Sequence, residues 1–416
     1  MLKRTIKSKG NVLAGIALCL ALFGGLVSLQ GYKKTWEIWN IPVSTLSFFD
    51  LRVITAGAKT YAEGHDPMLD NPYDISGRKL NYPRIWQALY PLGLGADDAG
   101  WLGVLSDALF LAGVVVAMPP LRNVGVAWLL AALVSPAVML ALERGNTDLL
   151  VFFLLALALV IRRTGWSLAV ILFAFVLKLF PLVAVIMVLG RKRSTAGKVF
   201  LFAAGFALLY LLFSLNDLLL IGANTPSDTW LSYGHNVLWM KVSETSPVAG
   251  SALRFGTHAV MAGGLLAAGL VWLRRSSRGK VQEGLPLDAF RVGAACYVGT
   301  FLLGNNFNYR LMFLLFTLPQ LLAWAANGEA RCVARVALAG IYFSLWSMVV
   351  DRWLQGLPGG VWCGLAVSEA AHWAAFGALL HLLCRTLPGW TVAWVRGGES
   401  RARLDGPRGE PEPNGV

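Results

Sequence analysis

The chain has 416 residues and a formal net charge of +13, and 56% of its residues are hydrophobic while only 14% are charged. A soluble domain carries about 25% charged residues, so this composition and a mean hydropathy of +0.59 exclude an ordinary soluble protein. The apolar residues form long runs with the positive charges between them, which is typical of a protein that crosses a membrane several times and not of one that binds nucleic acid.

The first apolar run, residues 11–31, follows Lys3, Arg4, Lys7 and Lys9. It is long enough to span a bilayer, and no Ala-x-Ala site follows it. The sequence therefore predicts a retained signal anchor with its N-terminus in the cytoplasm. Further spans are predicted at about 100–118, 124–142, 147–161, 199–221, 256–273, 288–304, 309–326, 333–350 and 361–384.

Residues 166–190 admit two interpretations. As one span they would place Arg191, Lys192, Arg193 and Lys198 outside, against the positive-inside rule. As a hairpin of two short arms, 166–177 and 182–190, they return the chain to the cytoplasm. An arm of about a dozen residues reaches ~18 Å, against a hydrocarbon core of ~30 Å, so the turn would lie in the outer half of the membrane. We predict the hairpin.

The predicted fold class is an all-α polytopic membrane protein, a bundle of about 10–12 transmembrane helices that includes this broken hairpin. Residues 1–395 form one integral membrane domain, and residues 396–416 are predicted to be a disordered cytoplasmic tail. Two long loops, 32–99 and 222–255, are expected outside, with both termini in the cytoplasm and the chain in the plasma (inner) membrane.

Lys178 is the most informative residue because an ammonium at membrane depth is costly, by between ~2.5 and ~17 kcal/mol depending on the scale. Pro181 lacks an N–H and disfavours a straight helix three residues later. Irregular backbone at such depth is tolerated only beside protein or a water-filled cavity. The pair therefore predicts a site for an anion, and a transporter could use the same arrangement.

Asp50 lies in Phe48-Phe49-Asp50-Leu51-Arg52, at the start of the first outer loop. A carboxylate close to the membrane surface is the best single candidate for a general base. The structural alternative is an ordinary helix cap, because Asp often starts a helix and residues 51–63 are able to form one.

Other polar residues of the predicted outer face have both structural and functional interpretations. Turns account for Asp66 and Tyr82, and Arg84 is a candidate for a phosphate contact. Glu143 is able to pair with Arg144, and Asp148 to cap a helix. Arg310 is placed either to snorkel or to bind a lipid phosphate. The possible acceptor or sugar contacts are Asp66, Tyr82, Glu143, Asn146, Asp148, His235 and Asn236.

Four stretches resemble the C-type (GT-C) membrane glycosyltransferases, and within them glycosyltransferase family 87, the polyprenol-phosphate-mannose-dependent mannosyltransferases. Gly64-His65-Asp66-Pro67 after Asp50 resembles the family's Gly-x-Asp-Pro-Tyr, and Asn81-Tyr82-Pro83 its Tyr-Pro-Pro, with Arg84 replacing the second proline. Arg144 to Asp148 falls where the family has Gly-Gln and a polar residue, and Lys178-Leu-Phe-Pro181 is similar to its Lys-x-x-Pro. The resemblance covers residues 40–195.

This resemblance implies transfer of mannose or a related hexose or pentose from a polyprenyl-phosphate donor to a glycan or glycolipid acceptor at the outer face. The chemistry needs one base, Asp50, and a cation that holds the departing phosphate, Lys178 with Arg310 or Arg84. The rivals are a transporter or lipid flippase and an O-antigen ligase or polymerase, for which His235 and Arg254 are available in the second long loop. No metal-ligand spacing is found, and no cofactor is expected.

Overall fold

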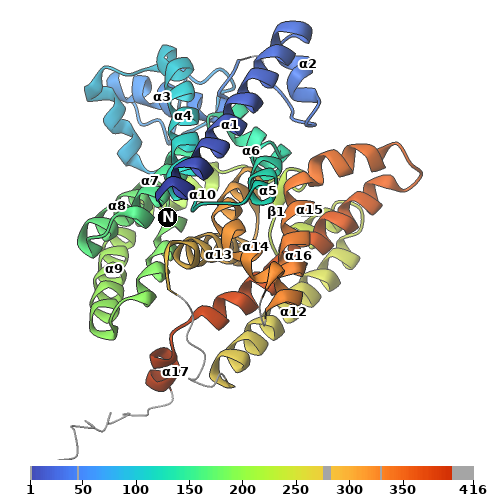
Figure 1. Cartoon of the computed structure of the whole chain (residues 1–416). Helices are drawn as coiled ribbons and strands as arrows, with labels where there is room; N and C mark the ends of the chain where they lie inside the picture. Colours follow the sequence, from blue (N-terminus) through green and yellow to red (C-terminus); the bar gives the residue numbers. More distant parts are fainter. Residues whose placement is uncertain (1, 45, 275–282, 328–329, 396–416) are drawn as a thin grey trace, which may run out of the picture.

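The computed structural model describes residues 2–44, 46–274, 283–327 and 330–395 (Figure 1). In this part the chain is helical almost throughout. The strands that it contains are two residues long each, β1 (Ser232–Tyr233) and β2 (Asn306–Phe307). They pair antiparallel, with Ser232 opposite Phe307 and Tyr233 opposite Asn306. The predicted all-α class is confirmed.

The first half of the chain begins with a long helix, α1, and then folds the predicted first loop into short helices before it returns to longer ones. These elements are α1 (Leu2–Gln30), α2 (Tyr32–Glu37), α3 (Phe49–Ala62), η1 (Arg84–Leu92), η2 (Ala96–Asp98), α4 (Ala99–Ala117), α5 (Asn123–Leu133), α6 (Pro136–Arg144), α7 (Asp148–Val160), α8 (Thr164–Leu177), η3 (Phe180–Gly190) and α9 (Arg193–Phe213).

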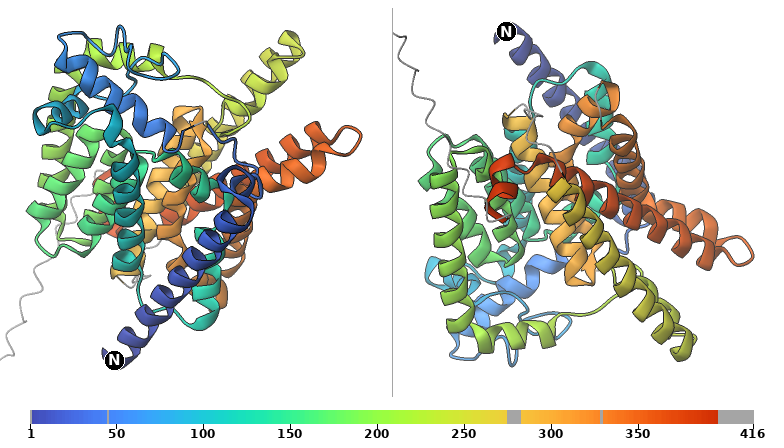
Figure 2. Two further views of the ribbon diagram at one scale, coloured as in Figure 1. Left: turned by 90° about the horizontal axis from the view of Figure 1, so that it is seen from above. Right: turned by 90° about the horizontal axis from the view of Figure 1, so that it is seen from below.

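The second half contains the longest helices after α1. Its helical elements are α10 (Leu215–Asn224), α11 (Val237–Ser243), α12 (Pro247–Arg274), α13 (Leu285–Leu303), η4 (Asn308–Thr317), α14 (Leu318–Ala326), α15 (Arg331–Gln355), α16 (Gly360–Thr386) and α17 (Gly389–Val395). In Figure 2, α12 and the α15–α16 hairpin extend from the body of the molecule on the side opposite α8 and α9.

Seven helical segments among the described residues are long and apolar enough to cross a membrane. An eighth is the pair α5 and α6, which corresponds to the predicted span 124–142 but bends by 53°. The bend follows from Pro136, which starts the second helix and has no N–H to continue the first. The other predicted membrane segments correspond to the shorter apolar elements α7, α8 and η3, and to α13.

The predicted hairpin has a clear counterpart in α8 and η3. Helix α8 ends at Leu177, Lys178 is extended (φ −162°, ψ 128°), and η3 begins at Phe180. The Ser167 hydroxyl lies 3.9 Å from the sulfur of Met187, so the two arms run back along each other. The chain therefore reverses at Lys178, as the charge rule and Pro181 predicted.

Helix α13 is the centre of the core and packs against η3, η4 and α16. Aromatic rings join these layers: Phe301 of α13 stacks on Phe376 of α16 with centroids 4.4 Å apart. The first loop has a smaller core of its own, formed by Val53, Ile54, Met68, Leu80 and Tyr82. This second core explains why a loop predicted from its polarity is ordered and able to position side chains.

Candidate functional site

The described residues surround a cavity of about 610 Å³. Its walls come from the start of α3, the 78–83 loop, the turn between α8 and η3, and the β1–β2 pair with its flanking residues. The charged and polar side chains that line it are Asp50, Arg78, Lys79, Asn81, Tyr82, Arg144, Lys178, Asn224, Thr225, Asp228, Asn305, Asn306, Tyr309 and Arg310. Residues separated by more than 250 positions in the sequence thus share one chamber.

Asp50 is placed in this cavity by the conformation of Phe48. Phe48 has a positive φ of 58°, and its backbone N–H donates to the carbonyl of Glu143 at 3.0 Å. Its side chain packs against Gly145, where a Cβ would approach the Cβ of Phe48 to 2.9 Å. Helix α3 then starts at Phe49 with Phe48 as its N-cap. The Asp50 carboxylate is therefore not the N-cap of this helix, and it is free for another contact.

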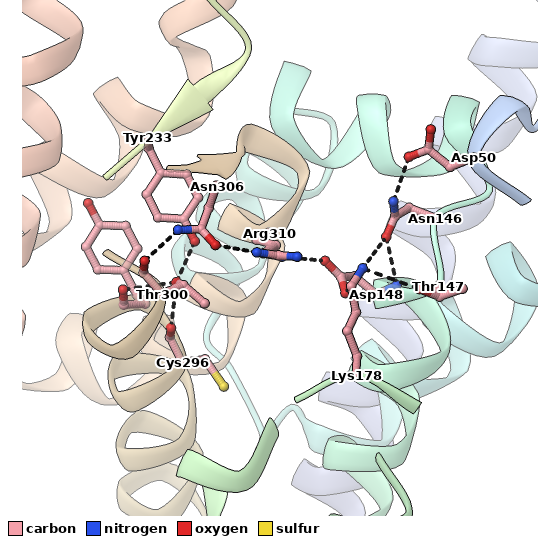
Figure 3. Close-up of polar contacts among 11 residues, drawn as sticks. Asp50, Asn146, Thr147, Asp148, Lys178, Tyr233, Cys296, Thr300, Asn306 and Arg310 are labelled. Atoms are coloured by element: carbon pink, nitrogen blue, oxygen red, sulfur yellow. Dashed lines mark hydrogen bonds and ion pairs between the residues drawn. The ribbon is translucent and has the colours of Figure 1, made fainter. Parts of the chain in front are cut away.

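A continuous polar series connects Asp50 to the cations of the cavity (Figure 3). The Asn146 amide N–H donates to Asp50 Oδ2 at 2.6 Å. The Asn146 amide oxygen accepts from Lys178 Nζ at 3.1 Å and from the Asp148 backbone N–H at 3.0 Å. Lys178 Nζ lies 2.7 Å from Asp148 Oδ1, and Arg310 Nε lies 3.3 Å from Asp148 Oδ2. One buried carboxylate therefore holds two cations, which leaves the group with one net positive charge.

Lys178 is already well coordinated. An ammonium has three N–H donors, and Nζ has Asn146 Oδ1, Asp148 Oδ1 and, at 3.3 Å, the Thr147 hydroxyl within reach. A ligand that binds Nζ directly must replace one of these, and the Thr147 contact is the longest. The rings of Tyr82 and Tyr309 lie 5.3 and 5.6 Å from Nζ and complete its surroundings.

Arg310 has more binding capacity left. Its Nε is used by Asp148 and its Nη1 by Asn306, whereas its Nη2 has no acceptor among the described residues. Asn306 is itself anchored, since its amide donates to the Thr300 carbonyl at 2.5 Å. The Thr300 hydroxyl meets the Tyr233 hydroxyl at 2.6 Å. Arg310 is thus held on a rigid wall with one face of its guanidinium available to an anion.

Arg84 and Asp66, by contrast, are not among the residues that line the cavity. Arg84 forms a two-pronged ion pair with Asp66 (2.8 and 3.1 Å) and a third contact of 2.8 Å with Asp217. Burial opposes ionisation of Asp66, but the hydrogen bonds from Arg84 prevail and hold the pKa of this carboxyl below its usual value. These contacts tie the first loop to α10, which is a structural role.

Three other predicted contacts also lie outside the cavity lining. Glu143 is completely buried, and its nearest cation is Arg144, whose Nε is 3.4 Å away. His235 Nδ1 lies 3.1 Å from the Phe301 carbonyl. Asn236 accepts from the Trp239 indole N–H at 2.9 Å. Asn146 and Asp148 do not line the chamber either, but they form its second layer.

Sequence reasoning missed several cations and amides of the site. The guanidinium of Arg78 lies 3.5 Å from the Phe49 ring centroid, and that of Arg144 lies 5.4 Å from it. Arg78 also pairs with Asp74 at 2.8 Å. Lys79 is exposed beside them. The closeness of Arg78 to Asp74, four residues apart, was the one local signal, and nothing local indicated that both flank Asp50.

No group of three or more His, Cys, Asp or Glu side chains in the described ranges is arranged to hold a metal ion. Comparisons with protein-family models, with curated proteins and with solved structures found no match. The functional argument therefore depends on the geometry of the cavity.

Proposed function

We propose that this protein transfers a sugar from a polyprenyl-phosphate donor to a glycan or glycolipid acceptor, with Asp50 as the base and Arg310 and Lys178 as the phosphate site. One observation carries the proposal: the series Asp50–Asn146–Lys178–Asp148–Arg310 joins a cavity-lining carboxylate to a group of net positive charge. A transfer from a lipid phosphate needs these two functions, a base and an anion site, side by side.

Asp50 is suited to accept a proton. Only its Oδ2 is engaged, by an amide N–H that leaves the carboxylate charge in place. In the reaction, the acceptor hydroxyl gives its proton to Asp50 while its oxygen forms the new bond to the anomeric carbon. The bond from that carbon to the phosphate oxygen breaks, and its electron pair leaves with the phosphate. Displacement of this kind inverts the anomeric centre, and it needs one carboxylate, whereas glycoside hydrolysis needs two.

The phosphate site would act on the charge that develops on the leaving group. A sugar phosphodiester carries one negative charge, and the departing lipid phosphate gains a second. The free Nη2 of Arg310 offers donors for direct contact, and Lys178 adds positive potential behind it. Because the site is partly buried, the interaction is stronger than in water. An orientation with the cavity at the outer face and both termini in the cytoplasm belongs to the same proposal.

The test is transfer of radiolabelled sugar from synthetic polyprenyl-phosphate mannose into lipid acceptors extracted from the host membrane. Asp50→Asn removes the base and keeps the volume, so transfer should fall by ~10²–10⁴-fold. Thermal stabilisation by polyprenyl phosphate should be unchanged. Asp70→Asn, in the same loop and outside the cavity lining, is the matched control and should behave as wild type.

Near-normal transfer by Asp50→Asn would reject Asp50 as the base. A wild-type protein that moves the labelled lipid across a vesicle membrane without breaking the sugar–phosphate bond would instead favour a flippase.

A further inference from the structure

A second, smaller cavity lies between α15, α16 and the outer side of the β1–β2 pair. Its volume is about 50 Å³, and a water molecule takes ~30 Å³ in the liquid. The polar residues that bear on its chemistry are Ser232, Asn308, Ser347, Asp351, Glu369 and His372. The site already described uses none of them.

Four buried polar atoms of this cavity have no hydrogen-bond partner among the described residues. They are Glu369 Oε2, His372 Nδ1, Asn308 Oδ1 and Ser232 Oγ. Each of these residues is 5% exposed or less. Buried polar groups in folded proteins are almost always satisfied, so four such atoms around one cavity indicate an occupant.

The charge of the cavity says what kind of occupant fits. Asp351 and Glu369 both line it, and neither forms an ion pair with any Lys, Arg or His in the described ranges. Lys241 is also at the rim, but its ammonium is held by Glu244 at 2.6 Å. The acceptors therefore outnumber the donors, and buried carboxylates without a counter-ion are unfavourable.

We propose that this cavity binds a small monovalent cation together with water, and that Glu369 and Asp351 supply the negative charge that retains it. Carboxylate, amide and hydroxyl oxygens are ligands suited to hard cations. A divalent or transition-metal site is disfavoured, because the described residues contain no group of three His, Cys, Asp or Glu able to hold one. Sodium is the probe of choice.

The cation would stabilise the wall that carries Arg310. Neighbouring residues of this wall alternate between the two cavities: Leu231 and Tyr309 line the large one, and Ser232 and Asn308 line the small one. An occupant that binds Ser232 and Asn308 therefore fixes β1 and the start of η4 in position. This inference is independent of the proposed reaction, since it concerns stability and ion binding.

The experiment measures the thermal unfolding of the full chain in detergent, in NaCl or N-methylglucamine chloride at about 0.15 M. The wild-type melting temperature should be ~2–4 °C higher in NaCl. Glu369→Gln removes the charge with little change in shape and should abolish the sodium-specific rise. The matched control is Asp107→Asn in α4, whose Oδ1 is also buried without a partner but lies away from this cavity. It should keep the rise.

Binding of ²²Na⁺ to the wild-type protein gives a direct second measurement, and Asp351→Asn replaces Glu369→Gln if the latter does not fold. Equal melting temperatures in the two salts, or a sodium effect that persists in Glu369→Gln, would overturn the proposal. A melting temperature that responds to pH and not to sodium would identify a water-filled, protonated cavity and overturn it as well.

Discussion

Replacing Lys178 with methionine tests whether this lysine is a lone buried cation or part of a paired group. For a lone cation the change would be neutral or favourable for folding, since a desolvated charge is removed. The structure reverses that sign, because Lys178 Nζ lies 2.7 Å from Asp148 Oδ1. At an effective dielectric constant near 20, two charges at this distance attract with roughly 6 kcal/mol before desolvation is subtracted.

Breaking a buried ion pair from one side typically costs about 3–5 kcal/mol, because it leaves a charge uncompensated. In Lys178→Met, Asp148 still has Arg310 at 3.3 Å, so the cost should fall toward the lower end, about 2–3 kcal/mol. The double variant Lys178→Met/Asp148→Leu leaves Arg310 as the remaining charge and restores the net charge of +1. Its free energy of unfolding should therefore recover most of the loss.

The assay is a double-mutant cycle on the free energy of unfolding, measured by denaturant titration in mixed detergent micelles. We expect the effects of the two substitutions to be strongly non-additive. A coupling energy below about 0.5 kcal/mol would refute the ion pair as a stabilising contact. A Lys178→Met protein as stable as wild type would do the same, and would restore the lone-cation interpretation.

Three further predictions follow from the same contacts. Asn146→Leu should lower transfer and shift its pH dependence, because the amide that holds Asp50 is lost; an unchanged pH profile would argue against it. In a cysteine-free background, Ser194→Cys should resist labelling from outside intact cells, and ready labelling would overturn the predicted hairpin topology. The lowered pKa of Asp66 means that its stabilising pair is complete above pH ~4 and is lost as the pH falls through the lower native pKa. Arg84→Met should therefore flatten the loss of melting temperature at acid pH, and an unaltered acid profile would contradict this.

The sequence by itself determined the class of this protein and the break in its membrane helices. Composition and apolar runs are local properties, so they were sufficient to predict a helical membrane protein. Lys178 and Pro181 impose their own cost and geometry on the segment that contains them, so the reversal between α8 and η3 was predictable as well.

The tertiary structure alone decided which polar residues act together. Asn146 joins Asp50 to Lys178 across 96 and 32 residues of sequence, and Arg310 meets Asp148 across 162. Arg84, which the sequence favoured as a phosphate ligand, is instead held by Asp66 and by Asp217 of α10. Such pairings depend on how helices pack, and the packing is set by buried apolar surfaces far from the charges themselves. A charged side chain reports that it needs a partner, but only the fold specifies which partner it receives.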